Sequence, residues 1–197
     1  GKQPGNNLPF ITYFVNIIKA VKENADVLRA SISGPGNDHR LGANEAPPAI
    51  ISIFVGNEMA RLLDEFEKIG LNPNAPEGNP TMELDIPKIP SAVLDNTDRN
   101  RTSPFPFIGN RFEFRAAGST QNCSLPMMTL NTLVADQLVS FKKSVDEKVF
   151  SGSPKELAII ETLQGYITES KSILFNGDGY SKDCLLYTSD AADDRIG

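Results

Sequence analysis

The sequence predicts an α+β fold in which helices pack against an antiparallel sheet. Segments with an apolar residue every three or four positions indicate amphipathic helices. Short β-branched or alternating segments indicate strands, and they are mixed with the helices without regular β-α alternation. The 197 residues have an ordinary globular composition, 40% hydrophobic and 22% charged. They suffice for one large domain or for part of a bigger one.

The first half of the chain predicts a helix, a strand and a second helix. A helix is expected over 9–32, where Ser33 and Gly34 end the pattern. Residues 49–55 favour a buried strand, although a helix start fits this apolar run as well. Asn57 can cap a helix over 58–69. The inward faces of the two helices would comprise Phe10, Phe14, Ile17, Val21 and Leu28, then Met59, Leu62, Leu63 and Phe66.

The second half predicts two longer helices. Residues 71–80 are rich in Asn, Pro and Gly and indicate a loop, and 81–86 alternate as a short strand does. A helix is expected over 126–150. Residues 153–156, Ser-Pro-Lys-Glu, form a capping-box pattern that starts another helix, which ends near Phe175. The inward face of the first would comprise Met127, Leu130, Leu133, Val134, Leu138, Phe141 and Val145.

Charge and cysteine content narrow the classes of partner. The net charge of −6 argues against broad attraction to nucleic acid. No apolar run approaches membrane-spanning length, so no membrane partner is expected. Cys123 and Cys184 provide neither a disulfide framework nor a metal-ligand spacing. A reducing, cytoplasmic location is therefore expected.

Residues 97–115 contain four arginines, and the carboxylate of Glu113 lies between the last two of them. Within 111–115, charged and aromatic residues alternate, so in a strand Phe112 and Phe114 would enter the core. The charged side chains would share the other face, where they suit a polyanion and a metal ion. An exposed ion pair on a half-buried sheet fits this segment as well. The charged residues of the stretch are Asp98, Arg99, Arg101, Arg111, Glu113 and Arg115.

The loop at 37–48 is a second polar cluster. It contains Arg40 and Glu45, which could bind a carboxylate and position a base, or could form an ordinary surface ion pair. His39 is the only histidine of the chain, and a lone loop histidine is more often structural than catalytic. Neither a P-loop nor a GxGxxG motif is present, so arginines and metal would have to hold any nucleotide phosphates.

Three motifs together resemble the C-terminal catalytic region of type III glutamine synthetases: RLGANEAPPAIISIF at 40–54, DRNRTSPFPFIGNRFEFR at 98–115 and ILFNGDGY at 173–180. The resemblance extends from about Pro4 to Lys182. It implies an ATP-dependent ligase that joins glutamate and ammonia into glutamine through γ-glutamyl phosphate. It also implies Mg²⁺ or Mn²⁺ as cofactor and a homo-oligomer for the full-length protein.

The resemblance assigns a role to five residues. Arg40 resembles the arginine that binds the carboxylate of the substrate glutamate. Glu45 resembles the flap glutamate that shields the intermediate and helps to take a proton from ammonium. Arg101 resembles the arginine that contacts the ATP phosphates and the transferring phosphoryl group. Glu113 resembles a metal-ligand glutamate, and Arg115 the arginine that holds the glutamate side chain and the phosphoryl group.

The chain departs from the wider family at one position. Type I enzymes have a further arginine five positions after the counterpart of Arg101, where this chain has Pro106. That role is vacant or filled elsewhere, as the type III pattern allows. Arg99 and Arg111 match no family role and are expected to be structural or exposed.

The resemblance predicts that residues 1–183 are part of a catalytic domain. The family's other metal ligands, a histidine and several glutamates, would precede Gly1, so the chain is expected to be inactive by itself. Residues 184–197, which include CLLYTSDAADD, resemble a translated sequencing adapter and are expected to be a non-native tail. The alternative function is a non-catalytic acidic helical module that mediates protein association through the helices at 9–32 and 126–150.

Overall fold

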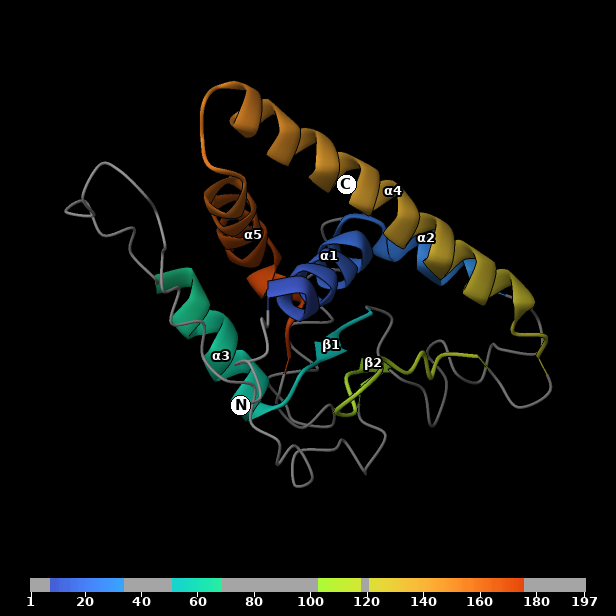
Figure 1. The fold of residues 1–197 in the computed structure, drawn as a ribbon. Helices are drawn as coiled ribbons and strands as arrows, with labels where there is room; N and C mark the ends of the chain where they lie inside the picture. Colours follow the sequence, from blue (N-terminus) through green and yellow to red (C-terminus); the bar gives the residue numbers. More distant parts are fainter. Residues whose placement is uncertain (1–7, 34–50, 69–102, 118–120, 176–197) are drawn as a thin grey trace, which may run out of the picture.

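The computed structural model describes residues 8–33, 51–68, 103–117 and 121–175. Two strands, β1 (Ile53–Phe54) and β2 (Phe105–Pro106), form a small sheet. In Figure 1, α4 lies along one side of the molecule, α1 and α5 lie beneath it, and the sheet lies beyond α1. The helices are α1 (Leu8–Glu23), α2 (Ala25–Ser31), α3 (Asn57–Lys68), α4 (Ser124–Phe150) and α5 (Lys155–Ser170), with a 3₁₀ turn at Lys171–Ile173.

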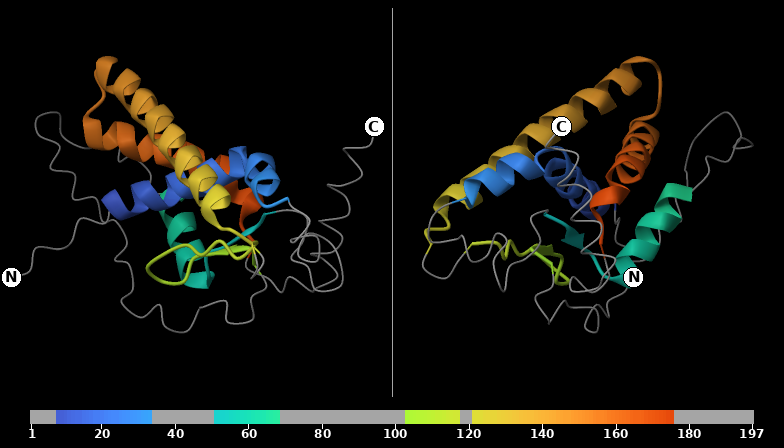
Figure 2. Two further views of the ribbon diagram at one scale, coloured as in Figure 1. Left: turned by 90° about the vertical axis from the view of Figure 1, so that its right-hand side faces the viewer. Right: turned by 180° about the vertical axis from the view of Figure 1, so that it is seen from behind.

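The core forms around α1, which contacts α4 and α5. Figure 2 shows α4 and α5 diverging from their connection with α1 between them. Because neighbours cover α1 on several sides, its buried residues extend beyond the single predicted stripe. Phe14, Val21 and Leu28 of that stripe are buried as predicted, whereas Phe10 and Ile17 are only partly buried. Further buried apolar residues of α1 are Leu8, Ile11, Val15 and Ile18.

The helix predicted over 9–32 is divided in two at Asn24. The Asn24 Nδ2 atom donates to the Ala20 carbonyl oxygen at 3.0 Å, and its backbone N–H donates to the same oxygen at 3.2 Å. An asparagine side chain that bonds to the backbone competes with regular helical hydrogen bonding. This competition explains the interruption between α1 and α2, which apolar periodicity alone does not reveal.

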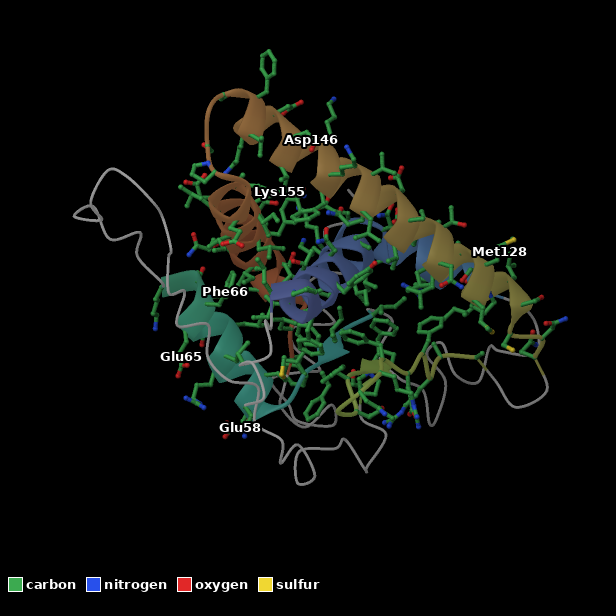
Figure 3. All side chains as sticks on the ribbon, in the orientation of Figure 1. Glu58, Glu65, Phe66, Met128, Asp146 and Lys155 are labelled. Atoms are coloured by element: carbon green, nitrogen blue, oxygen red, sulfur yellow. The ribbon has the colours of Figure 1, made fainter. Side chains whose placement is uncertain are left out.

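Helix α3 confirms the prediction for 58–69 with a small shift. Met59, Leu62, Leu63 and Phe66 are buried as predicted. Figure 3 shows Phe66 directed into the molecule, with Glu58 and Glu65 outside. The helix begins at Asn57, and Ala60 N–H donates to the Gly56 oxygen at 3.0 Å. Gly56, with a φ of 79°, is therefore the residue before the helix, and the prediction of Asn57 as the cap is wrong.

Helix α4 matches its predicted extent, but its inward face differs in part. Phe141 and Val145 are buried, and Leu130 and Leu133 pack partly buried against the core. Met127 is 56% exposed, so its predicted inward position is wrong. The buried position next to α1 is instead taken by Gln137, whose Nε2 donates to Asn16 Oδ1 at 3.1 Å. A polar residue that is satisfied inside the core cannot be identified from apolar periodicity.

Helix α5 begins without the predicted capping box. It starts at Lys155, Ala158 N–H donates to the Pro154 oxygen at 2.9 Å, and no side chain caps its N-terminus. It ends at Ser170 rather than near Phe175, because the 3₁₀ turn carries the chain on to Leu174. Among the described residues, no helix has both the length and the apolarity needed to cross a membrane.

The predicted antiparallel sheet is wrong for the sheet that the structure describes. Strands β1 and β2 pair in parallel, with Ile53 opposite Phe105, and Leu174 adds a parallel bridge to Ile53. Parallel neighbours require long connections, whereas the sequence pattern of a short strand carries no information about direction. In the described part of 49–55, only Ile53–Phe54 is strand, and the strand predicted at 81–86 lies outside the described residues.

Candidate functional site

The segment at 104–115 is a hairpin-like pair of extended arms. Glu113 N–H donates to the Pro106 oxygen at 2.9 Å, and Arg115 N–H donates to the Pro104 oxygen at 2.8 Å. Ile108 N–H donates to the Arg111 oxygen at 2.9 Å, which closes a turn at Gly109-Asn110. Proline has no N–H, so Pro104 and Pro106 cannot return these bonds. The pairing is therefore one-sided, and the only antiparallel bridge in the described residues is Phe107–Phe112.

One face of this hairpin is aromatic. The Phe105 and Phe112 rings stack with centroids 5.1 Å apart, and the Phe105 and Phe114 rings meet edge to face at 5.9 Å. Phe14 of α1 covers this face, with its centroid 4.9 Å from that of Phe107 and 5.2 Å from that of Phe112. Stacked and edge-to-face pairs are favourable beyond their buried area. The prediction that Phe112 and Phe114 turn towards the core is confirmed, although both are partly buried.

The other face carries the charges. Arg115 Nε donates to Glu113 Oε2 at 3.1 Å, and Arg111 Nη2 lies 3.7 Å from Glu113 Oε1. The exposed fractions of the side chains are 65% for Arg111, 36% for Glu113 and 21% for Arg115. The predicted grouping of the three charges is confirmed. Ion pairs this exposed contribute only about 0–1 kcal/mol, so fold stability gives little reason for the cluster.

The other candidate residues cannot be placed relative to this pair. Arg40, Glu45 and Arg101 lie outside the described residues, as do His39 and Arg99. Within the described ranges, no group of three or more His, Cys, Asp or Glu side chains could hold a metal ion. Within the 104–115 hairpin, Glu113 is the residue that can contribute a carboxylate, a ligand that Mg²⁺ and Mn²⁺ accept. The hairpin thus fits a partial contribution to a metal site.

A polar cluster at the end of α5 was missed by the sequence analysis. Lys171 pairs with Glu67, and its Nζ lies 3.1 Å from Asp64 Oδ1. Thr168 Oγ1 also donates to Glu67 Oε1 at 2.7 Å. The hydrogen bonds from Lys171 and Thr168 hold the pKa of Glu67 below its ordinary value, and the same partnership raises the pKa of Lys171. No local spacing links residues so far apart, so only the fold could reveal this connection between α3 and α5.

A second such cluster joins α1 to α5. Burial opposes the charge of Lys19, but its contacts with Glu169 and Glu23 outweigh that effect and raise its pKa. The Lys19 Nζ atom also lies 5.4 Å from the centre of the Tyr166 ring. The four-residue spacing of Lys19 and Glu23 could have been recognised in the sequence. The arrangement joins two helices and suggests no chemistry.

Comparison with known proteins identifies relatives. No family model matches the chain. A glutamine synthetase of Bacteroides fragilis (strain YCH46) is 51% identical over 184 residues. A type-3 glutamine synthetase of Dictyostelium discoideum is 43% identical over 183 residues, and a glutamine synthetase of Butyrivibrio fibrisolvens is 39% identical over 188 residues. Each match covers 93% of this chain and 24–25% of the relative.

The three relatives share one name, glutamine synthetase, and they confirm the resemblance that the motifs predicted. Over the stretch that it spans, the chain is similar to proteins named glutamine synthetase. One of the matched relatives is named specifically as a type-3 glutamine synthetase. The chain spans about a quarter of the length of these relatives. The matches do not favour the alternative of a non-catalytic association module.

Proposed function

We propose that this chain supplies part of the active site of an ATP-dependent glutamate–ammonia ligase, which forms glutamine through γ-glutamyl phosphate. The observation that carries the proposal is the similarity of 93% of the chain to proteins named glutamine synthetase. The charged face of the 104–115 hairpin supports it. Assembly as a homo-oligomer and a cytoplasmic location belong to the same proposal.

In this proposal, Glu113 is one ligand of a Mg²⁺ or Mn²⁺ ion, and Arg115 holds the substrate side chain and the transferring phosphoryl group. Phosphoryl transfer requires the protein chiefly to position the reactants and to stabilise charge. A divalent ion, when bound, neutralises negative charge on the phosphates. The guanidinium group of Arg115 supplies a permanent charge in a planar fork that suits phosphate and carboxylate oxygens.

The hairpin would keep the Glu113 carboxylate and the Arg115 guanidinium group preorganised. The Arg115 Nε–Glu113 Oε2 hydrogen bond sets their separation at 3.1 Å, and the adjacent backbone groups are bonded to Pro104 and Pro106. The aromatic face below fixes which way both side chains leave the backbone. Groups that are already in place need no reorganisation when charge develops during the reaction.

The remaining roles rest on residues outside the described ranges. Arg40 would bind the carboxylate of glutamate, Glu45 would shield the intermediate and accept a proton from ammonium, and Arg101 would contact the ATP phosphates. A single carboxylate is too few ligands for a metal site. Other parts of a protein of the relatives' length would have to complete the site, and this chain alone is expected to bind nucleotide weakly or not at all.

Calorimetric titration of ADP, with and without Mg²⁺, tests the proposal. The chain alone is compared with a chimera in which it replaces the stretch that it matches in the Bacteroides fragilis glutamine synthetase. The chimera should bind ADP in a Mg²⁺-dependent manner. Because even residues that only support metal ligands affect metal affinity by about 10–100-fold, Glu113→Ala should weaken Mg²⁺-dependent binding by at least about 10-fold.

Arg111→Ala is the matched control in the chimera, because Arg111 is the exposed neighbour in the same ion cluster and has no assigned role. It should leave ADP binding unchanged. Mg²⁺-dependent binding that survives Glu113→Ala at full strength would refute the role of this carboxylate.

A further inference from the structure

A buried serine connects β1 and β2 at the end where both strands enter the sheet. Ser103 is 4% exposed. Its Oγ atom donates to the Ser52 oxygen at 3.1 Å and accepts from Phe105 N–H at 3.2 Å. Ser52 directly precedes β1 and Phe105 is the first residue of β2, and Figure 1 shows the two strands side by side. Because a buried hydroxyl is costly unless it is hydrogen-bonded, these two bonds explain how a serine is tolerated here.

The Ser103 hydroxyl occupies a position in the hydrogen-bond ladder of the sheet. Further along the strands, Phe107 N–H donates directly to the Phe54 oxygen at 2.7 Å, as the parallel register requires. One step earlier, the same pattern would join Phe105 N–H to the Ser52 oxygen. The hydroxyl of Ser103 bonds to both of these backbone groups. It therefore links the two strands at this step of the ladder.

The same hydroxyl fixes the carbonyl group of Pro104. Phe105 N–H and the Ser103 side chain close a short turn around Pro104. Proline fixes its own φ and keeps the residue before it extended. The turn and the proline ring together set the direction of the Pro104 carbonyl group. Its oxygen accepts from Arg115 N–H at 2.8 Å.

Arg115 is the end of this series of hydrogen bonds. The series starts at the Ser52 oxygen beside β1 and passes through Ser103 and Pro104. The Arg115 side chain is 21% exposed, and its Nε atom donates to Glu113 Oε2 at 3.1 Å. The Glu113 backbone is bonded nearer the turn of the hairpin. Arg115 is therefore the member of the charged pair that depends most directly on Ser103.

We propose that Ser103 is a positioning residue for Arg115. Its hydroxyl sets how far the Pro104 segment lies from β1, and thereby sets where the Arg115 guanidinium group lies relative to the Glu113 carboxylate. Ser103 does not itself touch the reacting atoms. That the position of Arg115 matters for catalysis rests on the proposed function, whereas the control of that position by Ser103 rests on the hydrogen bonds alone.

Nitrogen–hydrogen correlation NMR of the complete chain observes the Arg115 Nε–H group directly, and Arg115→Lys identifies its resonance. Ser103→Ala should shift this resonance, because the Pro104 carbonyl group is no longer held and the bond from Nε to Glu113 changes. Ser170→Ala is the matched control, since Ser170 is 1% exposed and its hydroxyl has no hydrogen-bond partner among the described residues. The control should leave the resonance in place. An unchanged Arg115 resonance in a folded Ser103→Ala variant would overturn the proposal.

A second variant keeps the test decisive if Ser103→Ala does not fold. Circular dichroism establishes whether each variant keeps its helix content. A thiol is a weaker hydrogen-bonding group than a hydroxyl, so Ser103→Cys weakens the same two bonds without emptying the site. The Arg115 Nε–H resonance should again shift. A folded Ser103→Cys variant with the wild-type resonance would contradict the proposal.

Glutamine formation by the chimera tests whether the position of Arg115 matters for catalysis. Ser103→Ala should lower kcat by at least about 10-fold, since a small misplacement of a catalytic group can cost about 100-fold. In an Arg115→Ala background the same change should cause little further loss, because the group through which Ser103 acts is absent. Equal losses in both backgrounds would indicate a purely structural role and overturn the proposal. If the unsubstituted chimera forms no glutamine, the proposed function fails, and the NMR comparison still decides whether Ser103 positions Arg115.

Discussion

The Phe105 and Phe112 rings stack 5.1 Å apart at an interplanar angle of 9°, and they come from the two arms of the hairpin that carries Glu113. This contact joins the arms on the core side while the charges occupy the other side. Removal of one ring should therefore destabilise the hairpin that carries Glu113 and Arg115.

Phe112→Ala is expected to lower the free energy of unfolding. A fully buried phenylalanine costs about 3–5 kcal/mol on replacement by alanine, and Phe112 is partly buried, so we expect about 2–3 kcal/mol. Urea unfolding measures the change. Tyr13→Ala is the control, because Tyr13 is an aromatic residue of α1 that is 60% exposed. Its effect should remain within about 0.5 kcal/mol. Equal losses would show that the aromatic face does not support the hairpin.

The turn of the hairpin depends on Gly109. Its φ of 94° lies in the left-handed region, where a side chain costs about 1–2 kcal/mol. Gly109→Ala should reduce the free energy of unfolding by about that amount. Gly165→Ala is the opposite case, because Gly165 lies within α5 and a Cβ there meets nothing within 4 Å. That change should stabilise the protein by up to about 1 kcal/mol. Thermal unfolding of both variants distinguishes the two effects.

The buried pair of Asn16 and Gln137 should behave as one unit. Asn16→Ala removes the acceptor of Gln137 Nε2 and leaves a buried donor without its partner, which costs about 1–3 kcal/mol. The double variant Asn16→Leu with Gln137→Met replaces both polar groups. Its loss of unfolding free energy should be smaller than the sum of the losses for Asn16→Leu and Gln137→Met alone. A double-mutant cycle in urea measures the coupling. Additive effects would mean that the hydrogen bond contributes nothing specific.

The pattern of residues was enough to predict most of the helices and the two faces of residues 111–115. The buried faces of α1 and α3 follow from the local spacing of apolar residues, and the two faces of 111–115 follow from the local alternation of charged and aromatic residues. The direction of β1 and β2 could not be predicted, because it depends on how distant segments meet. Gln137 was missed for the same reason, since its partner Asn16 lies on another helix. The starts of α3 and α5 were each predicted one residue away from the observed start, where Gly56 and Pro154 precede the helices and their carbonyl oxygens accept the first helical N–H bonds.

Acid should weaken the link between α3 and α5. The hydrogen bonds from Lys171 and Thr168 lower the pKa of Glu67 below its ordinary value of 4.5. The stabilisation is therefore present above that value and is lost as the pH falls through the lowered pKa of the folded state. The difference in unfolding free energy between the wild type and Glu67→Gln should be largest near neutral pH. It should shrink on acidification below about pH 4.5.

The dependence of stability on pH in the alkaline range provides a second check on the Lys171–Glu67 ion pair. The pKa of Lys171 is raised above 10.5 by Glu67 and Asp64, so its contribution is present below that value and is lost as the pH rises through the raised pKa. Urea titrations at a series of pH values measure the free energy of unfolding in both the acidic and the alkaline range. A difference between the wild type and Glu67→Gln that does not vary with pH would contradict the ion pair.

The catalytic role of the hairpin is tested most directly by glutamine formation in the chimera with the Bacteroides fragilis protein. Loss of one preorganised charged group typically lowers kcat by about 10²–10³-fold, so Glu113→Ala and Arg115→Ala should each have an effect of this size. Arg111→Ala, from the same cluster, should leave kcat unchanged. If the chimera forms glutamine at its normal rate without Glu113, the assignment of this carboxylate to the active site is wrong.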